Sequence, residues 1–261
     1  MTRAATAASA GIPSSPGPTA APTSAEDVAQ WVSDFGRWVF EQLGALGSAL
    51  QQTLAAPAPR RADLAIEDRC SALLSDSRTA VAGAGAVFAP GVLADAPYWL
   101  EWWTVETRAG GTTVTKLAAE TDPRAVGFRD YTELPWYAKV LASGEPQVTG
   151  PYVDYLCTDQ YTLTFTAPLV VDGRFSGVVG VDVLVAWFEE HLLEVMGALE
   201  RTCVLVNAAG RVVTSSDPTW VTGDLIRDLP TEQWLAGEAA THPRWTAGRC
   251  ATLPFLVLTP R

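Results

Sequence analysis

Two long apolar runs separated by a two-residue turn constrain the fold of this chain most tightly. Tyr161–Val171 and Phe175–Val185 are rich in β-branched and aromatic residues, and Asp172-Gly173 lies between them. An Asp-Gly pair accepts the positive φ angles of a tight hairpin turn, so this arrangement is the strongest short-range hairpin signal a sequence offers. The pattern therefore predicts two neighbouring antiparallel strands.

Helical periodicity precedes and follows this hairpin. An apolar stripe runs from Trp31 to Leu54 after a favourable helix start at Ser24. A second helix is expected over 62–74, a short one over 134–141 and another over 186–199. Strands are expected at 80–88, 98–106, 112–119 and 147–153, and after Arg201 a strand-turn-strand, a helix from Thr231 and a last strand from Thr252. This order predicts an α+β fold.

The changes of period also predict domain boundaries. Residues 1–23 are rich in Ala, Pro, Ser, Thr and Gly without an apolar core, which is typical of a disordered leader. We expect an N-terminal helical region at 24–78, a first sheet module with its connecting helix at 79–200, and a shorter second module at 201–261. No run of about 20 apolar residues occurs, so we expect a soluble, cytoplasmic protein without a membrane span.

Charge and composition narrow the classes of partner. The formal net charge of −11 argues against nucleic acid and anionic membranes, because both attract Lys and Arg. Four Cys residues stand far apart and the two His residues lack ligand spacing, so no metal or other cofactor is expected. The sequence contains no Gly-x-Ser-x-Gly or phosphate-cradling glycine loop, and we expect a protein that is not an enzyme.

Aromatic and acidic residues cluster along the chain between positions 130 and 182. Carboxylates and aromatic faces together suit a small cation with an apolar body. Each residue also has a structural alternative: the aromatic rings as core, Asp154 as a solvated strand end, and Asp182 as a helix cap. Adjacent strand residues face opposite sides, so only one of a Trp pair should point inward. The candidate ligand-binding residues are Trp136, Tyr137, Tyr152, Asp154 and Asp182, with Trp102 and Trp103.

These residues resemble the Cache family of bacterial ligand sensors, in its double-Cache arrangement. The long leading helix, the strand ending in GVVGVD and the strand-turn-strand VLVNAAGRVV carry the likeness over roughly residues 25 to 261. The resemblance implies a long N-terminal helix, a PAS-like antiparallel-sheet Cache module and a second, smaller Cache-like module. In the amino-acid-sensing branch, an Arg, one residue and Trp-Tyr precede a Tyr-x-Asp and a strand-ending Asp. Trp136, Tyr137, Tyr152, Asp154 and Asp182 match the last five places.

The place of the family's Arg is occupied by Leu134. That Arg pairs with the ligand carboxylate in the family, which a leucine is unable to do. The groups for the amino end of a ligand remain, a pattern that resembles the amine-sensing branch. The resemblance therefore implies a ligand with a cationic nitrogen and no essential α-carboxylate.

The leading hypothesis is a binding module for a cationic amine, such as a quaternary ammonium compound, a biogenic amine or a polyamine. It would signal through a separate partner protein and could form a homodimer through the N-terminal helix. The alternatives are a scaffold protein with a vestigial Cache pocket, and a hydrolase that uses Asp154 and Asp182 as acid and base. A Cys157 nucleophile lacks a suitably placed His.

Overall fold

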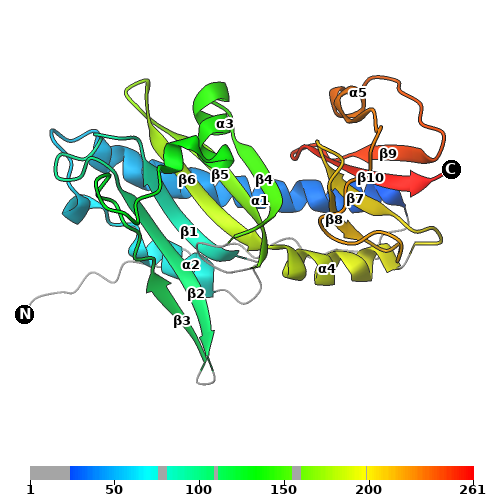
Figure 1. Ribbon diagram of the computed structural model, residues 1–261, viewed down its shortest axis with the longest axis horizontal. Helices are drawn as coiled ribbons and strands as arrows, with labels where there is room; N and C mark the ends of the chain where they lie inside the picture. The colour runs from blue at the N-terminus through cyan, green and yellow to red at the C-terminus, as the bar shows by residue number, and fades with distance from the viewer. Residues whose placement is uncertain (1–23, 76–80, 109–110, 155–159, 198) are drawn as a thin grey trace, which may run out of the picture.

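The computed structural model describes residues 24–75, 81–108, 111–154, 160–197 and 199–261. The expected disordered leader at 1–23 lies outside these residues. Two antiparallel sheets lie side by side along one long helix (Figure 1). The α+β class predicted from the sequence is confirmed.

The elements follow one another in a simple order. The helices are α1 Ala25–Leu54, α2 Glu67–Ser75, α3 Pro135–Ser143, α4 Val185–Gly197 and α5 Thr231–Ala236, with short 3-10 turns η1 Arg61–Asp63 and η2 Tyr131–Glu133. The first sheet has the order β3-β2-β1-β6-β5-β4 and contains β1 Val81–Phe88, β2 Leu100–Arg108, β3 Gly111–Lys116, β4 Gln147–Val153, β5 Tyr161–Val171 and β6 Arg174–Leu184. The helix expected over 62–74 is split into η1 and α2.

The expected hairpin is present as β5 and β6. The two strands pair from Thr162 opposite Leu184 to Val171 opposite Arg174. Asp172 and Gly173 form the turn with φ angles of 49° and 73°, in the left-handed region that this dipeptide tolerates. The hairpin prediction is confirmed, and β6 pairs with β1 on its other side, which places β6 inside the sheet.

The two faces of the first sheet pack against different helices. Alternating residues of the strands bury one face against α1 and the other against α3, as the two-residue period of a strand requires. Ala84, Ala86, Trp103, Phe165 and Val181 lie in the cluster with α1, and Val87, Trp102, Tyr137, Val140 and Val178 lie in the cluster with α3. The α1 face is the main core, whereas the α3 face holds the candidate site.

Helix α1 runs along both sheets and joins the two modules (Figure 1). Its start is fixed by a capping box, in which Ser24 accepts from the Asp27 backbone N–H and Asp27 accepts from the Ser24 N–H. Within the described residues, no helix is both long and apolar enough to cross a bilayer.

The second sheet has the order β8-β7-β10-β9. Its strands are β7 Val204–Asn207, β8 Val212–Ser215, β9 Trp245–Arg249 and β10 Phe255–Pro260. The strand-turn-strand, the helix and the last strand were expected, whereas β9 was not. Its mixed residues Trp-Thr-Ala-Gly-Arg lack a clear alternation, so its sequence alone does not distinguish it from a loop.

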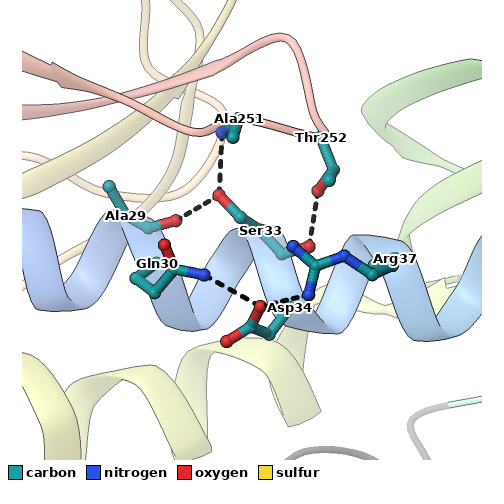
Figure 2. A network of polar contacts seen from close by, with 7 residues as sticks. All are labelled: Ala29, Gln30, Ser33, Asp34, Arg37, Ala251 and Thr252. Atoms are coloured by element: carbon teal, nitrogen blue, oxygen red, sulfur yellow. Dashed lines mark hydrogen bonds and ion pairs between the residues drawn. The ribbon is translucent and has the colours of Figure 1, made fainter.

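A polar junction fastens the second module to α1 (Figure 2). The buried Ser33 hydroxyl donates to the Ala29 carbonyl at 2.6 Å and accepts from the Ala251 backbone N–H at 2.8 Å. The Thr252 hydroxyl donates to the Ser33 carbonyl at 2.5 Å. Beside this junction, Leu253 packs against the backbone of Gly36, where a Cβ would lie 2.6 Å from the Leu253 side chain. The 251–253 turn is therefore seated directly on the helix.

Two alanine substitutions on α1 are expected to change stability in opposite directions. Gly36→Ala forces Leu253 away from the helix and should destabilise the fold by about 1–3 kcal/mol, as overpacking does. Gly44→Ala meets nothing within 4 Å and should stabilise it by up to about 1 kcal/mol, because alanine favours the helix. Urea denaturation of both variants measures this difference. Equal effects of the two substitutions would show that the 251–253 turn is not fixed on α1.

Candidate ligand-binding site

A cavity of about 70 Å³ lies on the α3 face of the first sheet. Five of the seven candidate residues line it: Trp102, Trp136, Tyr152, Asp154 and Asp182. The other lining residues in the described part of the chain are Val87, Leu100, Leu117 and Thr164. Segments separated by up to about a hundred residues in sequence thus converge through strand pairing.

Strand register explains the convergence. Asp182 of β6 lies opposite Gly83 of β1 on one side and opposite Thr164 of β5 on the other. Trp102 of β2 lies opposite Gly85. These five residues project from the same face of the sheet, because paired residues share a face and residues two apart along a strand do so too.

Asp182 is a buried carboxylate at the end of a chain of hydroxyl groups. The Thr164 hydroxyl donates to Asp182 Oδ1 at 2.7 Å, and the Tyr152 hydroxyl lies 2.6 Å from Thr164 Oγ1. Because Thr164 uses its only proton on Asp182, Tyr152 must be the donor to Thr164. Each donor strengthens the next, so the chain of hydroxyl groups orients Asp182 through Oδ1 and does not use Oδ2.

The environment of Asp182 disfavours its charge. Burial raises the pKa of the Asp182 carboxyl to about 7, the hydrogen bond from Thr164 opposes this rise, and the neighbouring Asp154 adds to it. Asp154 follows the end of β4, is 6% exposed, and its backbone N–H donates to the Gln160 carbonyl. The described residues that line the cavity include these two acids and no basic side chain. A cation in the cavity would compensate this excess of negative charge.

Three glycines leave room for the Trp102 indole to lie flat against the sheet. A Cβ on Gly83, Gly85 or Gly180 would lie 2.8–3.1 Å from Nε1, Cε3 or Cη2 of the ring, respectively. These three atoms are spread over both rings of the indole, so the ring plane lies against the sheet. Trp102 also lines the cavity, and only glycines leave room for this placement of its ring.

Helix α3 supplies the other aromatic wall. Trp136 is half-buried in the first turn of α3, and the Thr166 hydroxyl donates to its backbone carbonyl at 2.9 Å. Pro135 at the first helical position fixes the start of this helix. The first turn of α3 is thereby tied to β5, which holds Trp136 at the wall of the cavity.

A comparison with known protein families matches the part of the chain that contains the cavity. Residues 77–189 match the model of one protein family. That family is the methyl-accepting chemotaxis protein-like, first PDC sensor domain. The match spans the first sheet with β1 to β6 and all nine of the described residues that line the cavity, and it covers less than half of the chain. No curated protein matches the chain.

Solved structures resemble both modules together. The extracellular domain of the putative histidine kinase mmHK1S-Z3 superposes with a TM-score of 0.65 at 14% identity, covering 91% of this chain and 92% of that one. The ligand-binding domain of the Pseudomonas fluorescens chemoreceptor CtaA, in complex with L-valine, gives a TM-score of 0.53 at 18% identity, with 90% and 92% covered. The matched family is thus a sensor domain, and the two neighbours are an extracellular domain and a ligand-binding domain.

Two candidate residues lie outside the cavity of the PDC-like region. Tyr137 is 1% exposed and packs behind Trp136, with its ring 5.6 Å from Phe175 and 5.7 Å from Tyr131; burial raises its pKa. Trp103 points to the α1 face, as the alternation along β2 requires once Trp102 faces the cavity. Both are core residues, and neither is among the described residues that line the cavity.

Other residues of the matched region 77–189 have structural roles that the sequence did not indicate. Tyr131 is buried and donates to the Phe88 carbonyl at 2.7 Å. Leu134 caps the start of α3 and packs against the α3-face cluster. Thr164 was missed because its role depends on strand register, and an isolated Thr in a strand carries no such signal. Cys157 and Asp159 lie outside the described residues.

Proposed function

We propose that this protein is a non-enzymatic sensor that binds a small cationic amine in the cavity of its first module. The observation that carries this proposal is the pair Asp154 and Asp182, which are the charged side chains among the described residues that line the cavity. Both acids are buried, and burial disfavours the charged form of Asp182, which a cation beside it would favour. An ammonium group supplies the charge and the donors at once.

The geometry supports a definite pose. The ammonium donates to Asp182 Oδ2 and to Asp154, while its apolar body lies between the Trp102 face and Trp136. Each cation–π contact of this kind contributes about 0.5–2 kcal/mol. Val87, Leu100 and Leu117 form the apolar remainder of the wall, which suits a short hydrocarbon body. Such a ligand gives both carboxylates a charged partner. The cavity volume of about 70 Å³ favours a small ligand.

The same lining disfavours an amino acid as the ligand. The CtaA domain that resembles this chain was solved with L-valine. In this chain, the described residues that line the cavity contain no Arg, Lys or His to pair with a carboxylate. Leu134 stands where the resembling sensors of amino acids have their Arg. An α-carboxylate would therefore enter beside two acids without compensation.

The signal is expected to pass from the cavity to α1 through the sheet. Asp182 and Val181 are neighbours in β6 on opposite faces, and Val181 lies in the core cluster with α1. A partner protein would read a change in the packing of α1, and dimerisation through α1 remains a prediction. A scaffold with a vestigial pocket is less favoured, because a pocket without a ligand would not need two buried acids.

A thermal-shift screen with pure protein tests the proposal. Small primary amines should raise the melting temperature, whereas simple α-amino acids of similar size should leave it unchanged, because they lack a partner for the carboxylate. The matched pair 1-propylamine and glycine compares ligands of similar size with and without a carboxylate. Stabilisation by glycine and L-alanine but not by amines would refute amine sensing.

A further inference from the structure

The Trp102 indole nitrogen is a buried donor without a partner in the part of the chain that the structure describes. The Trp102 side chain is 7% exposed and lines the cavity. An indole N–H is donor only, and leaving it unpaired in the interior costs free energy. Nearly all buried polar groups of native proteins have a partner, so this donor requires an explanation.

An unused acceptor lies next to this donor. Asp182 Oδ1 is occupied by the Thr164 hydroxyl, while Oδ2 has no hydrogen-bond partner among the described residues. Trp102 Nε1 and Asp182 Oδ2 each lie 2.8 Å from the point where a Gly83 Cβ would stand. The two atoms are therefore no further apart than twice that distance. They form a donor and an acceptor side by side above a glycine.

A hydroxyl group is complementary to this pair, because it accepts one hydrogen bond and donates another. An ammonium group has no lone pair for Nε1, and an alkyl group satisfies neither atom. A carboxylate would accept from Nε1 but would bring its charge against Asp182. Of the common groups on a small amine, a hydroxyl thus fits the site best.

We propose that the ligand is a short primary amino alcohol with its hydroxyl on the carbon next to the aminomethyl group, and that Trp102 is the residue that selects it. The hydroxyl accepts from Trp102 Nε1 and donates to Asp182 Oδ2, while the neighbouring ammonium pairs with the Asp182 and Asp154 carboxylates. This inference rests on the proposed amine sensing and adds the second functional group. The two groups are close enough together to reach Nε1 and Oδ2 from one small molecule.

Isothermal titration with 2-aminoethanol and 1-propylamine tests the selection, because the two differ by a hydroxyl in place of a methyl group. The wild-type protein should bind 2-aminoethanol about tenfold more tightly. In Trp102→Phe, which removes the N–H and keeps an aromatic ring, this ratio should fall to about one. Trp103→Phe, on the opposite face of the same strand, is the matched control and should retain the wild-type ratio.

A second measurement does not depend on the folding of a variant. In ¹⁵N-labelled wild-type protein, 2-aminoethanol should shift one indole N–H resonance downfield, and 1-propylamine should not. Equal affinities for the two amines, or a preference that survives in Trp102→Phe, would overturn the inference and leave amine sensing intact. Failure of every amine to bind would overturn the inference together with the proposed function.

Discussion

Asp182→Asn is expected to abolish most of the binding of small amines. The substitution preserves shape and the acceptor for Thr164 but removes the charge that faces the ammonium. Losing one member of a buried charge pair costs about 2–5 kcal/mol, which corresponds to a dissociation constant about 30-fold larger at the least. Isothermal titration of a primary amine at pH 8 measures the effect.

Asp172→Asn is the matched control for this substitution. Asp172 lies exposed in the hairpin turn, where Asn also tolerates a positive φ, so the same chemical change there should leave affinity unchanged. Asp182→Asn should remain folded, because it removes an unfavourable buried charge and no packing. Wild-type affinity in Asp182→Asn would show that the ligand does not pair with this carboxylate.

Lowering the pH from 8 to 5 is expected to weaken amine binding by about 100-fold in the wild-type protein. With a pKa of about 7, Asp182 is mostly charged at pH 8 and mostly protonated at pH 5. Primary amines keep their charge over this range. A ligand that requires the carboxylate loses about tenfold in affinity for each pH unit below the pKa. Titrations in buffers with different ionisation enthalpies should also show that binding near pH 7 releases a proton.

Lowering the pH should raise the contribution of Asp182 to the free energy of unfolding of the unliganded protein, although it weakens amine binding. The pKa of Asp182 is raised above its ordinary value of 3.8 in the folded state, so the folded protein holds the proton more tightly. The contribution of Asp182 is therefore most favourable below pH 4 and is lost as the pH rises towards 7. Asp182→Asn should remove this contribution, so that at pH 8 the variant is at least as stable as the wild type.

For the binding prediction, an affinity for primary amines that does not change between pH 5 and pH 8 would contradict the raised pKa of Asp182.

The elements with strong local signals could be predicted from the sequence. Asp172-Gly173 carries the turn geometry itself, and the runs on either side are too apolar and β-branched for anything but buried strands. Helix α1 was equally predictable, because the helical spacing of its apolar residues and the capping signal at Ser24 both indicate a helix that begins there. Strand β9 and the break between η1 and α2 were missed because tertiary contacts decide them and their own residues do not.

The site was predictable only as far as residue types and alternation allow. The sequence implied that Trp102 and Trp103 face opposite sides, but the pairing of β2 with β1 decides which one meets the cavity. Tyr137 follows Trp136 directly, yet the helix turns it into the core. The contact of three glycines with the Trp102 ring was not expected, because only the register of the two strands places these glycines under one ring.

The shared helix has a practical consequence for dissecting the chain. A fragment that stops near residue 200 would lose the 251–253 turn and the second sheet, both of which cover the first half of α1. Positions of that half that the second module covers, such as Ala29 beside Gly248 and Gly36 beside Leu253, would then meet water. Such exposed stripes drive self-association. We therefore expect that a fragment of either module stays soluble only if the surface exposed by the cut is redesigned.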